Sequence, residues 1–331
     1  MNRKAVCAGV ALAFVAGTGS LVAQGNKTIV TVVKIAGIPW FNRLEEGVKE
    51  FGKTTPGYTA SQTGPAEADA AQQLKLIEDL VAKKVDALAI VPMDPGALEG
   101  VAKRAMDRGI VVVTHEADSQ KNTQADVEAF DNVAYGGSLN EALAKCMGGT
   151  GKWTSFVGSL GSRTHVQWAD GGAANAKKHP GMVLVDAKNE SLDDANKAYE
   201  KAKEILKKHP DIKGFQGSAS GDIIGIGRAI EEAGLQSKTC VFGTGLPSQA
   251  AKLLESGAVK GIGFWDPKNA GLAMNKVAKL LLEKKPITDG MDLGVPGYNN
   301  VIVKKGPGVG VVIVGKADVI ADRSIYKNFP F

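Results

Sequence analysis

The sequence predicts an α/β protein of two lobes, each built on a parallel β-sheet that is covered by helices. Short apolar runs alternate with amphipathic stretches from residue 28 onward, and the same alternation restarts after residue 150. Alternating strands and helices build parallel sheets with helices on both faces. The length of 331 residues also predicts two domains of roughly 150 residues each.

The first half of the chain begins with the run TIVTVVKI at residues 28–35, whose β-branched residues are typical of a strand. A helix is expected at residues 66–84, because Leu74, Ile77, Leu80 and Val81 share one helical face. The other elements expected in this half are helices at 41–53 and 96–108 and strands at 58–62, 86–91 and 110–114.

The second half repeats the pattern, with strands expected at 152–157, 182–186, 213–216, 239–242 and 259–264. Residues 195–208 form its clearest helix, with apolar residues on one side and lysines on the other. Segments 83–116 and 207–245 share one plan of strand, helix, glycine and second strand. Either two lobes share a topology, or a common βαβ arrangement recurs by coincidence.

The N-terminus has the pattern of a secretory signal peptide. Arg3 and Lys4 precede an apolar run at residues 5–17, and small residues offer a cleavage point after Ala23. That run is too short to span a bilayer, so we expect a soluble protein exported to the periplasm. Removal of residues 1–23 leaves Cys146 and Cys240, which can pair in an oxidising compartment, although spacing alone does not establish the pair.

Charge and motifs disfavour several function classes. The net charge of +5 is not concentrated in a Lys/Arg cluster interleaved with aromatic residues, so nucleic acid is a poor candidate partner. The segment GGTGKWTS at 148–155 departs from a phosphate-binding loop, and GxGxxG, HExxH and GxSxG motifs are missing. We therefore expect no enzymatic activity, no cofactor and no metal.

Ligand-binding residues are expected where strands end, because open parallel sheets bind ligands beyond the carboxyl ends of their strands. Those ends carry charged groups, hydroxyls and aromatic rings, which suit a polyol: hydroxyls need paired donors and acceptors, and the apolar face of a sugar ring needs a flat platform. The candidates are Lys34, Trp40, Phe41, Asn42, His115, Glu116, Arg163, His165, Ser218, Ser220, Trp265 and Asp266.

Several candidates have a structural alternative. Trp40 and Phe41 open a helix and could pack into the core, and the Asp266–Pro267 pair could start a helix as its N-cap. His115 and Glu116 could form an acid–base pair or a surface turn, and Arg163 and His165 could be surface residues. Trp168 is expected in the core. Lys34 closes a buried strand, so a nearby acid or ligand oxygen is expected.

Four segments resemble the type I periplasmic sugar-binding proteins of ABC importers, within them the branch of autoinducer-2 receptors and rhamnose-type binders. They are VVKIAGIPWFNRLEEGVKEFG, TGPAEADAAQQLKLIEDLVAKKVDALAIVPMDPGAL, KRAMDRGIVVVTHEADSQ and GFWDPKNAGLAMNKVAKLLL. By this resemblance Lys34 matches a ligand-gripping lysine, whereas Glu116 replaces an Asp. Thr164–His165 replaces an Asp–Gln pair, and Ser218 and Ser220 replace a Pro and an Ala. These changes favour a deoxyhexose, pentose or hexose over autoinducer-2.

The resemblance further implies two Rossmann-like lobes joined by a three-strand hinge. The N-terminal lobe would comprise residues 26–131 and 267–298, and the C-terminal lobe residues 132–266 and 299–331. Closure of the lobes around a small sugar would be read by a membrane ABC permease, or by a chemoreceptor, with the protein itself a monomer. The alternatives are an autoinducer-2 receptor, a Rossmann-type sugar-converting enzyme, and a related repressor, which would need a helix-turn-helix where the signal peptide lies.

Overall fold

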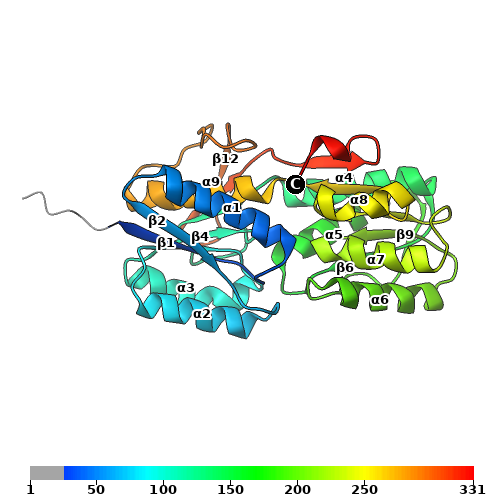
Figure 1. Cartoon of the computed structure of the whole chain (residues 1–331), viewed down its shortest axis with the longest axis horizontal. Helices are drawn as coiled ribbons and strands as arrows, with labels where there is room; N and C mark the ends of the chain where they lie inside the picture. Colours follow the sequence, from blue (N-terminus) through cyan, green and yellow to red (C-terminus); the bar gives the residue numbers. More distant parts are fainter. Residues whose placement is uncertain (1–25) are drawn as a thin grey trace, which may run out of the picture.

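A computed structural model describes residues 26–331, which form two α/β lobes side by side along the long axis of the molecule (Figure 1). Each lobe contains its own sheet, and the predicted fold class is confirmed. Both sheets are mostly parallel, and each carries an antiparallel strand at one edge. The predicted signal peptide, residues 1–23, lies outside the described residues.

The sheet of the first lobe has seven strands, and all neighbouring strands in it are parallel except β12 and β13. In spatial order they are β12 (Ile302–Lys305), β13 (Val311–Val314), β5 (Ala125–Glu128), β4 (Val111–His115), β3 (Ala87–Ile90), β1 (Lys27–Val32) and β2 (Tyr58–Thr63). Strands β3 and β4 are buried along their whole length, which explains why they read as continuous apolar runs.

The sheet of the second lobe pairs its strands in parallel except at β14. Its spatial order is β14 (Val319–Asp322), β11 (Gly261–Phe264), β10 (Cys240–Thr244), β9 (Ile212–Gly217), β6 (Thr150–Val157) and β7 (Gly181–Leu184). A two-residue strand, β8 (Asn189–Glu190), pairs with the end of β6 and begins an irregular segment that leads to the next helix.

Helices cover both faces of each sheet (Figure 1). In the first lobe α1 packs against α9 and α2 packs against α3; in the second lobe α4 packs against α5 and α6 packs against α7. Their bounds are α1 (Pro39–Thr54), α2 (Ala70–Ala82), α3 (Pro95–Asp107), α4 (Asn132–Met147), α5 (Arg163–Ala176), α6 (Ala195–Lys208), α7 (Ser220–Glu232), α8 (Pro247–Ser256) and α9 (Pro267–Leu282). A short 3-10 helix, η1 (Tyr326–Asn328), lies near the C-terminus.

Aspartates define where many of these helices begin. The N-cap side chains of α2, α3, α4, α6 and α9 accept hydrogen bonds from backbone N–H groups of the first turn, which would otherwise lack partners. These caps are Asp69, Asp94, Asp131, Asp194 and Asp266. The predicted N-cap alternative for Asp266 is therefore what the structure contains.

The chain crosses between the lobes three times: between β5 and α4, between β11 and α9, and between β13 and β14. The last crossing differs from the expected boundary, which assigned all of residues 299–331 to the second lobe. Strands β12 and β13 instead extend the first sheet, because the apolar run Val311–Val314 pairs in parallel with β5. The sequence carries no local signal for which of two similar sheets accepts an edge strand.

A disulfide joins Cys146, near the end of α4, to Cys240 at the start of β10. Their Cα atoms are 6.0 Å apart, which lies in the usual range for a disulfide. The bond therefore fixes one helix to the sheet inside the second lobe and closes a long loop of chain.

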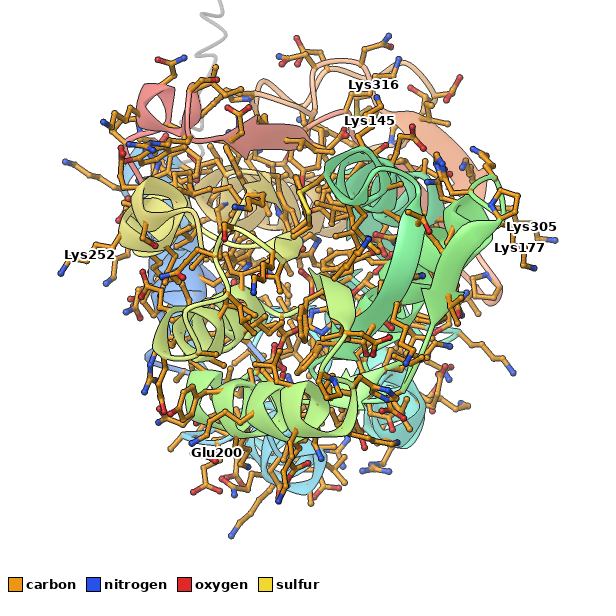
Figure 2. The ribbon with its side chains drawn as sticks, turned by 90° about the vertical axis from the view of Figure 1, so that its right-hand side faces the viewer. Lys145, Lys177, Glu200, Lys252, Lys305 and Lys316 are labelled. Atoms are coloured by element: carbon orange, nitrogen blue, oxygen red, sulfur yellow. A yellow bond between two sulfur atoms is a disulfide. The ribbon has the colours of Figure 1, made fainter. Side chains whose placement is uncertain are left out.

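The charged surface is dispersed. Seen from the end of the second lobe, the labelled side chains of Lys145, Lys177, Glu200 and Lys252 point outward in different directions (Figure 2). Among residues 26–331, no helix combines the length and the apolar character needed to cross a bilayer.

Candidate functional site

The two lobes enclose a cavity at the carboxyl ends of their parallel strands. In this closed arrangement the space between its side chains is narrow. Its wall is both polar and aromatic, and consists of Lys34, Ile38, Trp40, Phe41, Glu116, His165, Trp168, Asp193, Ser218, Ser220, Thr244 and Trp265.

The first lobe supplies a cation and a carboxylate from two strand ends. Lys34 lies two residues beyond β1, and Glu116 directly follows β4. Because the two strands point the same way in one sheet, both side chains reach the same edge. Glu116 has φ of +58°, a left-handed backbone conformation that is uncommon for a residue with a side chain and that concentrates at functional sites.

The second lobe supplies its residues from several elements. His165 and Trp168 project from α5, Ser218 follows β9, and Thr244 is the last residue of β10. Asp193 comes from the irregular segment between β8 and α6, where its backbone φ is also positive, at +55°. Two of the charged cavity residues, one in each lobe, are thus held in strained conformations that only the surrounding packing can maintain.

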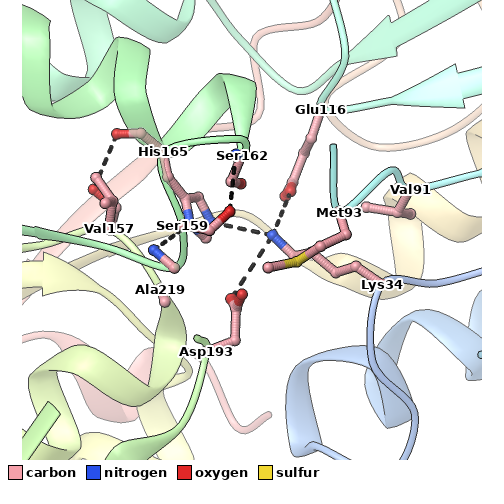
Figure 3. Close-up of polar contacts among 12 residues, drawn as sticks. Lys34, Val91, Met93, Glu116, Val157, Ser159, Ser162, His165, Asp193 and Ala219 are labelled. Atoms are coloured by element: carbon pink, nitrogen blue, oxygen red, sulfur yellow. Dashed lines mark hydrogen bonds and ion pairs between the residues drawn. The ribbon is translucent and has the colours of Figure 1, made fainter. Parts of the chain in front are cut away.

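Lys34 is the centre of the polar contacts in the cavity (Figure 3). Its Nζ lies 3.3 Å from Glu116 Oε2 within its own lobe. Across the lobe boundary it lies 3.2 Å from His165 Nε2 and 3.8 Å from Asp193 Oδ1. All four side chains are at least nine-tenths buried. The contacts that cross the boundary show that the lobes are closed on one another.

Burial and neighbouring charge act in opposite directions on Lys34. Burial alone lowers its pKa, but the nearby Asp193 and Glu116 carboxylates outweigh that effect, so the pKa is raised and the side chain is an ammonium. Burial raises the pKa of Asp193 above its ordinary value, and the Lys34 charge opposes that rise. The cavity therefore contains a buried cation with acceptors on either side.

The tautomer of His165 follows from its other ring nitrogen. Nδ1 lies 3.0 Å from the backbone N–H of Gly158, which can only donate, so Nδ1 is the acceptor. Burial, and then the Lys34 charge, hold the pKa of His165 well below its ordinary value, so the ring is neutral with its proton on Nε2. Lys34 and His165 thus present two donors to each other, and a single oxygen atom placed between them would accept from both.

Aromatic rings form the rest of the wall. The rings of Trp40 and Trp265 meet edge to face with centroids 4.6 Å apart, and Trp168 lies 5.7 Å from Trp265. Trp168 Nε1 donates to Asn132 Oδ1 at 2.9 Å. Trp265 Nε1 and Asp193 Oδ2 are buried without a hydrogen-bond partner among the described residues. Two residues of the cavity wall thus carry a polar atom with no partner among the described residues.

Asp222 fixes the serine loop of the cavity. Its Oδ2 accepts from the backbone N–H groups of Ser218 and Ala219 at 2.9 and 2.8 Å. Burial raises the pKa of Asp222 to about 7, against the hydrogen bonds to its carboxyl group that favour the charged form. Ser218 Oγ also donates to the His165 backbone carbonyl at 3.3 Å, which links this loop to α5.

Eight of the twelve predicted ligand-binding residues lie in the cavity wall: Lys34, Trp40, Phe41, Glu116, His165, Ser218, Ser220 and Trp265. The structure thus brings together residues that are far apart in the sequence, although their contact with a ligand stays a prediction. Trp40, Phe41 and Trp265 are also buried in the core, so the core and cavity interpretations are compatible.

The other four predicted residues are engaged elsewhere. Asn42 donates to the carbonyl of Gly37, and His115 is buried with Nδ1 against the carbonyl of Val127. Asp266 accepts two hydrogen bonds from Arg43, at 2.9 and 2.7 Å, besides capping α9. Arg163 Nε donates to Asp118 Oδ1 at 2.8 Å.

Sequence reasoning did not select four residues of the wall. Trp168 was expected in the core and is both buried and exposed to the cavity. Thr244 lies two residues beyond the expected end of its strand, and Ile38 lies in the loop before α1. Asp193 follows no regular strand, but the expectation of an acid beside Lys34 was a usable signal for it.

Within residues 26–331, no group of three His, Cys, Asp or Glu side chains is arranged to hold a metal ion. The cavity combines donors, acceptors and flat apolar walls, an arrangement that can bind and enclose a small polar ring. Closure of the lobes removes the enclosed groups from water and so strengthens their hydrogen bonds.

Comparison with known proteins agrees with this architecture. Residues 29–286 match the family model described as "Periplasmic binding protein domain". The chain is similar to the D-allose-binding periplasmic protein of Escherichia coli (strain K12), with 27% identity over 72% of this chain and 79% of the relative.

Among solved structures, the chain is similar to an ABC transporter solute-binding protein from Clostridium phytofermentas with bound L-rhamnose, with a TM-score of 0.84 and 21% identity, covering 92% and 98% of the two chains. It is also similar to LsrB from Clostridium saccharobutylicum in complex with AI-2, with a TM-score of 0.83 and 19% identity, covering 92% and 100%. At these identities the two structures establish a shared fold.

Proposed function

Because the chain belongs to the periplasmic binding protein domain family, we propose that it captures a small sugar between its lobes and delivers it to the permease of an ABC importer. The observation that supports this most directly is the closed cavity in which Lys34 meets groups from both lobes. The names of its curated relatives, which include D-allose-binding and D-ribose/D-allose-binding proteins, point to the same ligand class.

Each part of the wall has a role in this proposal. The Lys34 ammonium and the His165 Nε2–H donate to one ligand oxygen, while Glu116 and Asp193 accept from neighbouring hydroxyls. Trp40, together with the other cavity tryptophans, packs against the apolar face of the ring. A site that buries such groups rejects analogues which lack a hydroxyl, because its own donors and acceptors are then left unpaired.

The composition of the cavity wall favours a single ring. Charged and hydroxyl groups lie beside three tryptophan rings in a narrow space, so we propose a deoxyhexose, pentose or hexose as ligand. Rhamnose and arabinose are bound in structures that share this fold, and allose and ribose are named for the curated relatives. These sugars differ in the number and configuration of their hydroxyls and, between pentoses and hexoses, by one carbon.

We also propose that the protein works outside the cytoplasm. The signal-peptide pattern of residues 1–23 supports export, and the Cys146–Cys240 disulfide fits an oxidising compartment. There a permease would distinguish the closed, loaded form from the open one, and a chemoreceptor could use the same difference. N-terminal sequencing of the exported protein tests cleavage after Ala23, and light scattering tests whether the protein is a monomer.

Calorimetric titration with a panel of sugars tests the binding role. The panel contains L-rhamnose, D-fucose, D-allose, D-ribose and D-arabinose, with autoinducer-2 as the competing ligand. We expect one monosaccharide to bind with a Kd in the micromolar range or below, about −8 kcal/mol, and to raise the melting temperature. If no member of the panel binds, the sugar proposal is wrong.

Tryptophan fluorescence locates the binding event. We expect the bound sugar to change the emission of wild-type protein and of a Trp153→Phe variant, because Trp153 lies in a separate core of the second lobe. The change should be smaller in Trp265→Phe, whose ring lines the cavity. Equal changes in both variants would place the ligand elsewhere.

A further inference from the structure

Asp118 connects the two lobes at a point that is not part of the cavity wall. It follows β4 in the first lobe, two residues after Glu116. Its Oδ1 accepts from Arg163 Nε at 2.8 Å and its Oδ2 accepts from Gln167 Nε2 at 2.6 Å. Both donors belong to α5 of the second lobe, so each oxygen of the Asp118 carboxylate accepts a hydrogen bond from the opposite lobe.

The first turns of α5 have two functional faces. His165 and Trp168 face the cavity, whereas Arg163 and Gln167, one helical turn apart, face Asp118. A similar division exists across the boundary, where Glu116 lines the cavity and Asp118 does not. The contact with Asp118 therefore joins the first lobe to the helix that carries two cavity residues.

The two kinds of contact across the lobe boundary differ in what a ligand does to them. Lys34 meets His165 and Asp193 inside the cavity, and a bound sugar would exchange those contacts for its own. The Asp118 contacts lie outside the wall and can persist with any ligand, or with none. These contacts therefore do not depend on which ligand the cavity encloses.

We propose that Asp118, Arg163 and Gln167 form an interlobe clasp that sets how readily the lobes close. The clasp changes the affinity for every ligand by the same factor and leaves the preference among ligands unchanged. This follows because apparent affinity scales with the fraction of protein in the binding-competent state. The affinity part rests on the proposed function, whereas the closure part concerns the protein without ligand.

Closure is measured by energy transfer between dyes on the two lobes. Lys75 in α2 and Lys197 in α6 are exposed and can be replaced by cysteine, because Cys146 and Cys240 are already joined. We expect Asp118→Asn to reduce the closed fraction of the ligand-free protein, since an amide NH₂ now faces one of the two donors. Arg163→Met should act in the same direction.

Affinity is measured by calorimetry with the preferred sugar and with a second, weaker one. We expect Asp118→Asn to weaken both by the same factor, about fivefold, in line with partly exposed ion pairs and hydrogen bonds to charged groups. The double variant Asp118→Asn, Arg163→Met should bind each sugar with an affinity within about twofold of that of Asp118→Asn alone. The reason is that both substitutions remove the same interaction.

Two further variants test whether the effects are specific to the clasp. Asp211→Asn breaks an ion pair with Lys152, 2.9 Å long and also partly exposed, that lies within the second lobe, and it should change neither closure nor affinity. Gly161→Ala touches no clasp residue, but its Cβ would lie 2.9 Å from Asp94 Oδ2 of the first lobe, so it should oppose closure by contact alone.

If the ratio of the Kd values for the two sugars differs between Asp118→Asn and wild type, the proposal is wrong, because Asp118 then takes part in discriminating between ligands. Unchanged energy transfer and unchanged affinity would also overturn it. If no sugar binds the wild-type protein, the proposed function fails, and the energy transfer of the ligand-free variants still decides whether the clasp closes the lobes.

Discussion

Lys34 Nζ and His165 Nε2 face each other across the lobe boundary at 3.2 Å as two hydrogen-bond donors with no acceptor between them. The Gly158 N–H at Nδ1 fixes this arrangement, because it leaves the proton of the neutral ring on Nε2. Two buried donors in contact are unfavourable, and an acceptor oxygen relieves both at once. The closed cavity is thus prepared for one particular atom of its ligand.

Replacement of Lys34 by Met is expected to weaken sugar binding by about 10- to 100-fold, the usual effect of losing a hydrogen bond to a charged group. It also leaves Glu116 and Asp193 without their cation, so the melting temperature should fall. Calorimetry on folded protein measures the first effect. His165→Gln keeps a donor and should bind better than His165→Leu, and equal affinity of these two variants would contradict the donor role.

We expect the ionisation of Asp222 to contribute to the pH dependence of the free energy of unfolding. Its pKa is about 7 in the folded protein and 3.8 as the ordinary value, so between these pH values the folded state binds a proton that the unfolded state lacks. Stability therefore falls as the pH rises from about 4 to about 7, by up to about 1.4 kcal/mol per pH unit. Asp222→Asn removes this contribution.

Denaturant unfolding at pH 4, 5.5, 7 and 8 measures the effect. The stability of Asp222→Asn relative to wild type should increase as the pH rises, while the amide oxygen still accepts from Ser218 and Ala219. Asp211 is a control for which stability should change with pH in the opposite direction, because the hydrogen bond from Lys152 lowers its pKa. Asp211→Asn should lose stability above pH 4 and not gain it, and parallel curves for the two variants would refute the assignment.

Reduction of the Cys146–Cys240 disulfide is expected to lower the free energy of unfolding. Cross-linking residues 94 positions apart restricts the unfolded chain, and closing a loop of that length stabilises the folded state by roughly 4.6 kcal/mol in the chain-entropy model. Urea unfolding with and without reductant, and of the Cys146→Ser, Cys240→Ser variant, measures the loss. The sugar Kd should not change, because both cysteines lie outside the cavity wall, and a stability unaffected by reductant would contradict the prediction.

The close approach of α4 and α5 predicts a sharp difference between two adjacent glycines. A Cβ on Gly136 would overlap the backbone of Trp168, so Gly136→Ala must displace α5 and should cost about 1–3 kcal/mol. It should also weaken sugar binding, because His165 and Trp168 move with the helix.

Gly137→Ala is the matched control for this prediction. Its Cβ would meet Gly171 O at an ordinary distance of 3.6 Å, and alanine favours a helix over glycine by up to about 1 kcal/mol. This variant should therefore be as stable as wild type or more so. Similar losses of stability in the two variants would contradict the close packing of α4 on α5, and unchanged sugar binding by Gly136→Ala would show that this packing does not position the site.

Much of the fold and part of the site could be predicted from periodicity. The predicted helix at residues 195–208 has those bounds as α6, because its lysine-rich and apolar faces are unambiguous. Lys34, Glu116 and His165 were selected because the carboxyl ends of parallel strands share one edge. That argument needs only the strand assignments, which buried β-branched runs such as IVVVT supply.

The rest depends on pairings between distant residues. Nothing near Arg163 in the sequence indicates that it meets Asp118, and nothing near Asp266 indicates Arg43, so both looked available for a ligand. Asp193 lies in an irregular segment whose path is set by the pairing of β8 with β6. The place of β13 in the first sheet could not be predicted for the same reason, because its partner β5 lies far away in the chain.

The place of β13 has a consequence for the order in which the molecule can assemble. As the chain emerges from the ribosome, residues 27–128 supply five strands of the first sheet, but β13 and β12 arrive only after nearly the whole second lobe has been made. The sheet of the second lobe is also incomplete until β14 has been made. Such long-range pairing slows folding. An unfinished first lobe would keep the nascent chain unfolded for longer, which fits the proposed export of this protein across a membrane.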